Sequence, residues 1–201
     1  MTVRVAILDR DGTIIDVVRD EETGAITVAF HPDQLRLLDG ALAGMRALQQ
    51  AGFALAIATN QPAPAKGQFS ASAVRRTNEA LVARLGTEGV RIAALEACMH
   101  HPEGGEGGDP ALVRRCACRK PKPGMLDAIV TRLGADRAAS WMIGDSTGDL
   151  EAGRAAGLRT GLVFGQNRCE LCPLRGGPAG LRPDVHGPSL RHVADAILLH
   201  G

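Results

Sequence analysis

Two carboxylates, one residue apart, stand at the end of an apolar run near the start of the chain. Residues 5–8 are apolar, and Asp9, Asp11 and Gly12 follow at once. Because the run does not alternate with polar residues, it predicts a buried strand of a parallel sheet, whose carboxyl end is where open α/β sheets bind ligands. Two close carboxylates repel each other unless a cation lies between them, and Mg²⁺ prefers such oxygen ligands. With Mg²⁺ bound, one carboxylate can act as a nucleophile and the other can carry a proton. On its own, the pattern also fits an acidic turn.

Other polar residues follow apolar runs later in the chain. They are Thr59 with Asn60, Asp145 with Asp149, and Lys120 ahead of a helix begun by Pro123. Parallel strands bring such residues to one edge of a sheet, so Asp145 is placed to complete the Mg²⁺ site. The Thr59 hydroxyl and the Asn60 backbone N–H can hold phosphoryl oxygens, and Lys120 adds positive charge. A nucleophile, a cation, hydrogen-bond donors and an acid are what phosphoryl transfer requires.

The elements that must position these residues alternate between strands and helices. Strands are expected at residues 3–8, 53–58, 92–97, 141–143 and 159–164. Helices are expected at residues 39–51, 70–85, 123–133 and 189–199, and a further helix is expected to follow Asp149 and end at residue 156. This alternation predicts a doubly wound, Rossmann-like α/β fold with a parallel sheet, in one domain over residues 1–201. Residues 14–30 are expected to form a loop or small hairpin over the site, and no large cap domain is expected. Residues 167–188 are expected to be coil within a C-terminal flap and helix.

A second cluster of ligand-type residues lies in an irregular loop, residues 98–118. Cys98, His100, Cys116 and Cys118 supply three sulfurs and one nitrogen, a closed tetrahedral set typical of structural Zn²⁺. His101 is an alternative to His100, and reduced free cysteines are the alternative to a metal site. Cys169 and Cys172 fit a redox pair or half of a second metal site with His186 or His192. A plain pair of thiols is favoured, because the partner ligands of such a site lack motif spacing.

The composition excludes several classes of protein. The formal net charge is +1, hydrophobic residues make up 45% and aromatic residues only 2%. No basic surface or base-stacking set is indicated, which argues against a zinc-knuckle nucleic-acid-binding protein. No apolar run approaches membrane-spanning length, and the acids at the N-terminus do not fit a signal peptide. A cytoplasmic enzyme or binding domain is expected, with no nucleic-acid or membrane partner. We also expect a monomer.

The motifs, taken together, resemble those of the haloacid dehalogenase-like phosphatases. The resemblance covers roughly residues 3 to 165 and rests on Asp9-Arg10-Asp11-Gly12-Thr13, Thr59, Lys120, and Gly144-Asp145 with Asp149. It implies that Asp9 is the nucleophile and Asp11 the general acid/base. It also implies Mg²⁺ bound by Asp9, the backbone carbonyl of Asp11, and Asp145, with Thr59 and Lys120 steadying the phosphoryl group.

A narrower resemblance concerns the loop with the cysteines. The runs 98–104 and 116–125 are similar to the zinc loop of D-glycero-D-manno-heptose 1,7-bisphosphate phosphatases, and histidinol-phosphatases carry a related loop. This resemblance favours His100 as the ligand and implies a small sugar-phosphate substrate contacted by Asn60, Gln61, Lys66, Arg119 and Lys120. The sequence departs from the pattern in residues 62–67, where Lys66 replaces an arginine and keeps its charge without the planar fork. The heptose class is preferred, with a histidinol-phosphatase or another small sugar-phosphate phosphatase as the alternative.

Overall fold

Six parallel strands form the central sheet of the protein. The computed structural model describes residues 2–19, 22, 24, 26–164 and 180–200. The strands are β1 (Arg4–Leu8), β4 (Phe53–Asn60), β5 (Ile92–Cys98), β6 (Trp141–Gly144), β7 (Arg159–Val163) and β8 (Val185–Gly187). Their order in the sheet is β5-β4-β1-β6-β7-β8, and every neighbouring pair is parallel. The order reverses beside β1, so Asp9 and Asp11 follow the strand where α/β sheets form a ligand crevice.

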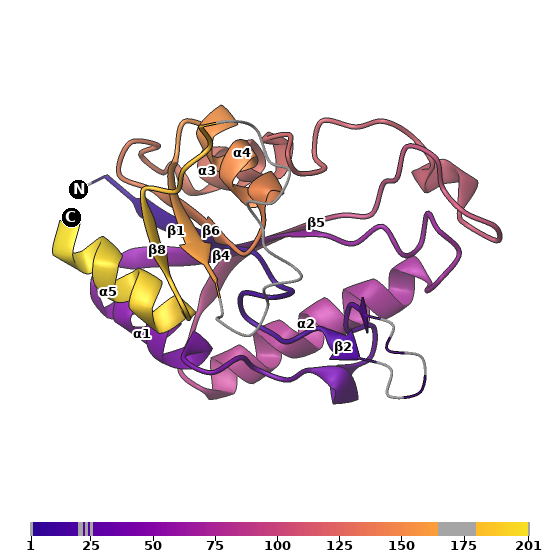
Figure 1. The fold of residues 1–201 in the computed structure, drawn as a ribbon, viewed down its shortest axis with the longest axis horizontal. Helices are drawn as coiled ribbons and strands as arrows, with labels where there is room; N and C mark the ends of the chain where they lie inside the picture. The colour runs from indigo at the N-terminus through magenta and orange to yellow at the C-terminus, as the bar shows by residue number, and fades with distance from the viewer. Residues whose placement is uncertain (1, 20–21, 23, 25, 165–179, 201) are drawn as a thin grey trace.

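Helices cover both faces of this sheet, which confirms the predicted doubly wound α/β class. They are α1 (Ala41–Gln50), α2 (Ala71–Thr87), α3 (Gly124–Leu133), α4 (Thr147–Ala155) and α5 (Leu190–His200). Figure 1 shows α1, α2 and α5 on one side of the sheet and α3 and α4 on the other. The buried side chains accordingly form two clusters, one on each face. Because β1 is covered on both faces, four of its five residues are buried, and this explains its lack of alternation.

The segment between β1 and α1 forms a small addition over the carboxyl edge of the sheet. Its described residues include the hairpin of β2 (Val18–Arg19) and β3 (Ile26–Thr27), which are antiparallel, and a 3₁₀ turn, η1 (Pro32–Gln34). A loop or a small hairpin was expected in residues 14–30, and the described residues contain the hairpin. Phe30, just after the hairpin, stacks on Phe69 with ring centroids 3.6 Å apart. The hairpin segment is thus packed against the loop that follows β4.

Most of the predicted element boundaries agree with the structure to within a few residues. Ser70 caps α2 as expected, because its Oγ accepts a hydrogen bond from the Ala73 N–H at 3.1 Å. The prediction of continuous coil over residues 167–188 is wrong in part, because β8 lies within it and pairs with β7. Three residues are too few to show a period, and the strand exists because β7 supplies its hydrogen-bond partners. Cys169 and Cys172 lie outside the described residues.

Candidate active site

The predicted catalytic residues meet in one cavity at the carboxyl edge of the sheet. The cavity has a volume of about 230 Å³ and is lined by Asp9, Asp11, Val28, Thr59, Asn60, Lys120, Asp145, Ser146, Gly148 and Asp149. These residues come from the loops after β1, β3 and β6, the end of β4, the segment before α3 and the start of α4. Gln61, Lys66 and Arg119 do not line this cavity, so their predicted contacts with substrate stay predictions. A larger groove of about 530 Å³ between α2 and β5 is mainly apolar and lies away from the acidic pair.

Lys120 is held in the wall of the cavity by three oxygen atoms from different parts of the chain. Its ammonium lies 2.8 Å from Asp9 Oδ1 and 2.5 Å from Asp149 Oδ1, and it donates to the Ala58 carbonyl at 2.8 Å. The backbone of Lys120 is fixed too, because it exchanges two hydrogen bonds with the Asn60 side chain at 3.0 and 3.1 Å. Although burial opposes the charged form, the two carboxylates raise the pKa of Lys120 above its ordinary value. Lys120 therefore provides a fixed positive charge beside Asp9.

Asp149 is completely buried and orients Lys120. Its other oxygen accepts hydrogen bonds from the backbone and the hydroxyl of Ser146, at 3.1 and 2.5 Å, in a capping box at the start of α4. Gly144 allows this approach, because a Cβ at that position would lie 2.3 Å from Asp149 Cγ. The sequence motif contained Asp149 but gave it no role. Ser-x-x-Asp spacing before a helix is the signal that points to the Ser146–Asp149 pair.

Asp9 is in a setting that disfavours its charged form when no metal is bound. Burial raises its pKa to about 7, and the Asp149 and Asp11 carboxylates add to this despite the opposing effect of Lys120. A cation beside Asp9 would reverse this electrostatic cost. Oxygens of Asp9, Asp145 and Asp149 all lie within 4.8 Å of one another. An all-oxygen donor set of this kind fits Mg²⁺.

Asp11 belongs to a hydrogen-bond network behind the cavity. Its Oδ2 accepts from Gln61 Nε2 at 2.6 Å, and the same amide nitrogen lies 2.9 Å from Thr59 Oγ1. Gln61 is fully buried, so it links the strand ends of β1 and β4. Arg10, which the sequence reasoning did not single out, donates to both Asp11 oxygens. The sequence did contain a signal for the role of Arg10. An arginine that closely follows a buried strand must be paired if it is buried too.

The four predicted zinc ligands converge in the loop after β5. Cys98 Sγ lies 3.6 Å from Cys116 Sγ and 3.2 Å from Cys118 Sγ, and His100 Nδ1 lies 3.7 and 3.2 Å from Cys98 and Cys118. Tetrahedral zinc with ordinary bond lengths would separate two sulfurs by about 3.8 Å and a sulfur from a nitrogen by about 3.5 Å. The donor set therefore fits zinc with little movement. His101 is directed elsewhere, because its Nδ1 accepts from the Glu103 and Gly104 backbone at 3.3 and 3.1 Å.

Proton affinities within this cluster differ among the three thiols. Burial raises the pKa of Cys98 and of Cys118. Burial also opposes ionisation of Cys116, but hydrogen bonds from neighbouring groups, Cys118 first among them, lower its pKa overall. Zinc binds thiolates, so metal uptake by this set would release protons.

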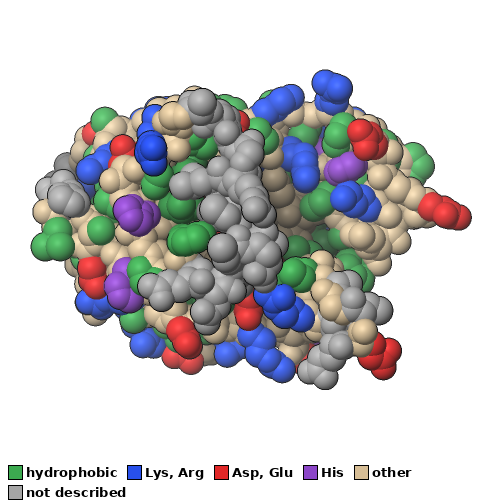
Figure 2. Space-filling view, viewed as in Figure 1, with side chains coloured by type: hydrophobic (Ala, Val, Ile, Leu, Met, Phe, Trp, Pro, Cys, Tyr) green, Lys and Arg blue, Asp and Glu red, His purple; other side chains and the backbone are tan. Residues whose placement is uncertain are grey.

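The loop of residues 98–118, which carries the predicted zinc ligands, packs closely on the segment after β4. Asp109 N donates to the Pro64 carbonyl at 3.0 Å, and a Cβ at Gly67 would lie 2.0 Å from the Glu106 carbonyl oxygen. Lys66 is therefore presented by a segment whose backbone rests on this loop. Burial, with the positive charges of Lys66 and Arg119, lowers the pKa of His101, so these three side chains are electrostatic neighbours. Figure 2 shows Lys, Arg and His side chains gathered over the lobe formed by this loop.

Comparisons with known proteins agree with this geometry. Residues 117–172 match the HAD-hydrolase-like family model. Over 159 residues, 79% of each chain, the protein is 34% identical to the D-glycero-beta-D-manno-heptose-1,7-bisphosphate 7-phosphatase of Yersinia pestis. The enzyme of that name from Rhodopseudomonas palustris is 37% identical over 155 residues, which cover 76% of this chain and 79% of the relative.

Solved structures give the same result. The D,D-heptose 1,7-bisphosphate phosphatase of B. bronchiseptica, complexed with magnesium and phosphate, superimposes with a TM-score of 0.76 at 31% identity, covering 99% of this chain and 100% of that one. A putative HAD-like phosphatase from Mesorhizobium loti gives 0.74 at 29% identity, covering 100% and 88%. The chain therefore belongs to the haloacid dehalogenase-like hydrolases, in the family of the heptose-1,7-bisphosphate 7-phosphatases. Among the described residues, no helix is both long and apolar enough to cross a membrane.

Proposed function

We propose that the protein hydrolyses the 7-phosphate of D-glycero-D-manno-heptose 1,7-bisphosphate in the cytoplasm, in the synthesis of nucleotide-activated heptose. The observation that carries this proposal is the cavity in which Asp9 faces Lys120, with Asp11 on its wall. The relatives named above support the choice of a heptose bisphosphate. A cavity of about 230 Å³ suits a phosphoryl group and the adjoining part of a small sugar.

The proposed reaction has two halves. In the first, an Asp9 carboxylate oxygen attacks phosphorus, the bond to the sugar oxygen breaks, and Asp11 gives that oxygen a proton, which leaves an aspartyl-phosphate and a free sugar hydroxyl. In the second, Asp11 takes a proton from water, the water oxygen attacks phosphorus, and the bond to Asp9 breaks. Inorganic phosphate leaves and Asp9 is restored.

Other side chains of the cavity would bind and orient the phosphoryl group. Thr59 Oγ and the Asn60 backbone N–H are placed as donors to its oxygens, and the Lys120 ammonium offsets its charge beside Asp9. Asp9, Asp145 and the backbone carbonyl of Asp11 would hold Mg²⁺, which supplies further positive charge for the phosphoryl oxygens when it is bound.

The Cys98, His100, Cys116 and Cys118 set is proposed to hold a structural Zn²⁺. Four protein ligands leave no open position, so the metal would stiffen the loop and take no part in chemistry. That loop leads directly into Arg119 and Lys120. The proposal therefore gives zinc the role of fixing the two cationic side chains that follow its last ligand.

Arg119, Lys66 and Gln61 complete the proposed substrate contacts. Arg119 Nη1 is buried and has no hydrogen-bond partner among the described residues. Since buried polar groups are normally hydrogen-bonded, this nitrogen is suited to bind an anion of the substrate. The second phosphate of a heptose bisphosphate would provide that anion. Lys66 would assist Arg119 there, because the charges of both side chains act on His101. Gln61 would not touch the substrate directly but would orient Thr59 and Asp11 through its hydrogen bonds to both.

Phosphate release from a panel of substrates tests the function. We expect the heptose bisphosphate to give the highest kcat/KM, ahead of heptose monophosphates, other sugar phosphates and histidinol phosphate. If histidinol phosphate is preferred, the heptose assignment is wrong and a histidinol-phosphatase takes its place. If no phosphate ester is turned over with Mg²⁺ present, the phosphatase proposal itself fails.

A further inference from the structure

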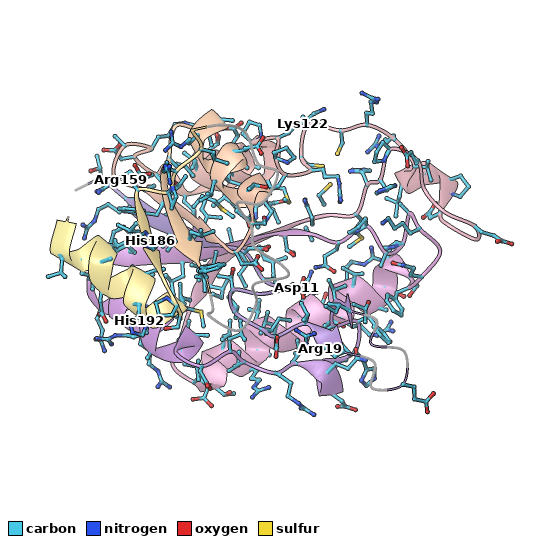
Figure 3. All side chains as sticks on the ribbon, in the orientation of Figure 1. Asp11, Arg19, Lys122, Arg159, His186 and His192 are labelled. Carbon is cyan, nitrogen blue, oxygen red and sulfur yellow. The ribbon has the colours of Figure 1, made fainter. Side chains whose placement is uncertain are left out.

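Arg10, which stands between the two proposed catalytic acids in the chain, is completely buried. Its guanidinium donates four hydrogen bonds: Nε to Asp11 Oδ2 at 3.1 Å, Nη2 to Asp11 Oδ1 at 2.9 Å and to the Ala29 carbonyl at 3.1 Å, and Nη1 to Asn78 Oδ1 at 2.7 Å. Arg10 does not line the cavity, so any effect it has on a substrate must pass through a neighbour. The neighbour that does line the cavity is Asp11, which lies between the sheet and α2 (Figure 3).

The contacts of Asp11 restrict what its carboxyl group can do. A carboxylate has about four acceptor positions on its two oxygens. Among the described residues, Arg10 occupies one position on each oxygen, and Gln61 occupies a second position on Oδ2. One position on Oδ1 is left. The paired contact with a planar guanidinium also fixes the plane of the carboxyl group, as a single hydrogen bond would not.

We propose that Arg10 is a positioning residue for proton transfer: with Gln61, it locks the Asp11 carboxyl group so that Oδ1 exchanges the proton with the substrate. The inference rests on the proposed phosphatase function and extends it to a residue outside the cavity. The step concerned is the one already described, in which Asp11 protonates the sugar oxygen as its bond to phosphorus breaks. Proton transfer depends steeply on alignment, and a displacement of about 1 Å can lower a rate about a hundredfold.

The guanidinium of Arg10 is itself held by hydrogen bonds to two other parts of the fold. Asn78 belongs to α2 and is buried, and Ala29 belongs to the hairpin segment whose next residue, Phe30, stacks on Phe69. Val28, beside Ala29, lines the cavity. The alignment of Asp11 therefore depends on the same segment that closes one side of the substrate site, and a substrate seated against that segment finds the acid already oriented.

The test compares two leaving groups. Arg10→Lys keeps the charge but cannot make the planar paired contact, and Arg10→Met removes all four hydrogen bonds. The values of kcat/KM are measured with the heptose bisphosphate, whose alkoxide must be protonated, and with p-nitrophenyl phosphate, whose leaving anion is stable without a proton. We expect each variant to lose at least about tenfold more on the sugar phosphate than on the aryl phosphate. Equal losses on both substrates would overturn the proposal, because a purely structural defect affects both.

Further variants separate positioning from other effects. In an Asp11→Asn background, Arg10→Lys should add no further selective loss, and a selective loss that persists there would mean that Arg10 does not act through Asp11. If the Arg10 variants do not fold, Asn78→Ala, which removes only one hydrogen bond of Arg10, carries the same comparison. A matched control is Arg84→Lys, since Arg84 also donates to a backbone carbonyl, that of Leu35 at 2.7 Å, but lies outside the site. The phosphatase function is tested separately. The wild-type protein should turn over both esters, and Asp9→Asn should abolish both activities.

Discussion

The Lys120 ammonium lies 2.5 Å from Asp149 Oδ1, and both side chains are almost completely buried. The same ammonium lies 2.8 Å from Asp9, so Asp149 helps to fix the positive charge beside the proposed nucleophile. Asp149→Asn would leave Lys120 paired mainly with Asp9 and draw the nucleophile toward it. We expect kcat to fall by at least about a hundredfold, comparable to the loss of one preorganised donor, with a lower melting temperature because a buried ion pair is broken. Asp195→Asn, in the half-exposed pair with Arg191, is the control and should change neither quantity appreciably.

The nucleophile gives the most direct test of the chemistry. Asp9→Asn removes the attacking anion while keeping the size of the side chain. Turnover of the heptose bisphosphate should drop by at least about a thousandfold, as for other nucleophile removals. Phosphate release and circular dichroism of the same preparation would be measured together. A folded Asp9→Asn protein that keeps more than about a tenth of wild-type turnover is incompatible with an aspartyl-phosphate on Asp9.

Magnesium binding should depend on pH through Asp9. Burial and the neighbouring carboxylates raise the pKa of Asp9 to about 7 in the metal-free protein, so a proton occupies it at lower pH and competes with the cation. The affinity for Mg²⁺ should therefore fall as pH decreases below about 7, approaching tenfold per pH unit, and level off above it. Titration calorimetry at pH 6, 7 and 8 measures this. An affinity that does not change across that range would show that Asp9 carries no proton to displace.

Zinc should be held tightly while magnesium exchanges. Elemental analysis after desalting is expected to find about one zinc per chain, and Cys116→Ser should lower that content and the melting temperature together, since binding of structural zinc is coupled to folding. Cys169→Ser and Cys172→Ser are suitable controls, because these thiols are not part of the four-ligand set. Protein purified without chelators that contains no zinc would contradict the proposed site.

Selectivity for a bisphosphate should depend on Arg119. In the proposed mechanism Lys120 offsets charge on the phosphoryl group being transferred, beside Asp9. Arg119 Nη1, in contrast, is buried and has no hydrogen-bond partner among the described residues. Arg119→Ala should weaken the preference for heptose bisphosphate over monophosphate by about 1.5–3 kcal/mol, the range for a hydrogen bond to a charged group. The ratio of kcat/KM values for the two substrates is the measurement, with Arg115→Ala, an exposed arginine of the same loop, as the control. Equal losses on both substrates would place Arg119 on the reacting phosphate instead.

The sequence alone determined the fold class and the groups that meet at the site. Asp9, Thr59 and Asp145 each lie at the end of a strand of a parallel sheet, and the geometry of parallel strands brings their ends to one edge whatever the details of packing. The cluster of Cys98, His100, Cys116 and Cys118 was predictable for a similar reason. Their spacing within a short loop limits how far apart they can lie, and sulfur and imidazole ligands imply a particular class of metal.

Only the tertiary structure decided which partner each charged group has. Arg10 meets Asn78, 68 positions along the chain, and Lys120 meets the Ala58 carbonyl, 62 positions away. No local pattern encodes such contacts, because they depend on how α2 and the loop of residues 98–118 pack against the carboxyl edge of the sheet. The same holds for β8, which is a strand because β7 lies beside it. Local periodicity and short-range spacing specify the helices, the longer strands and the ligand sets. The pairing of Lys120 with Asp9 and Asp149 depends instead on long-range packing, because the three residues come from separate parts of the chain.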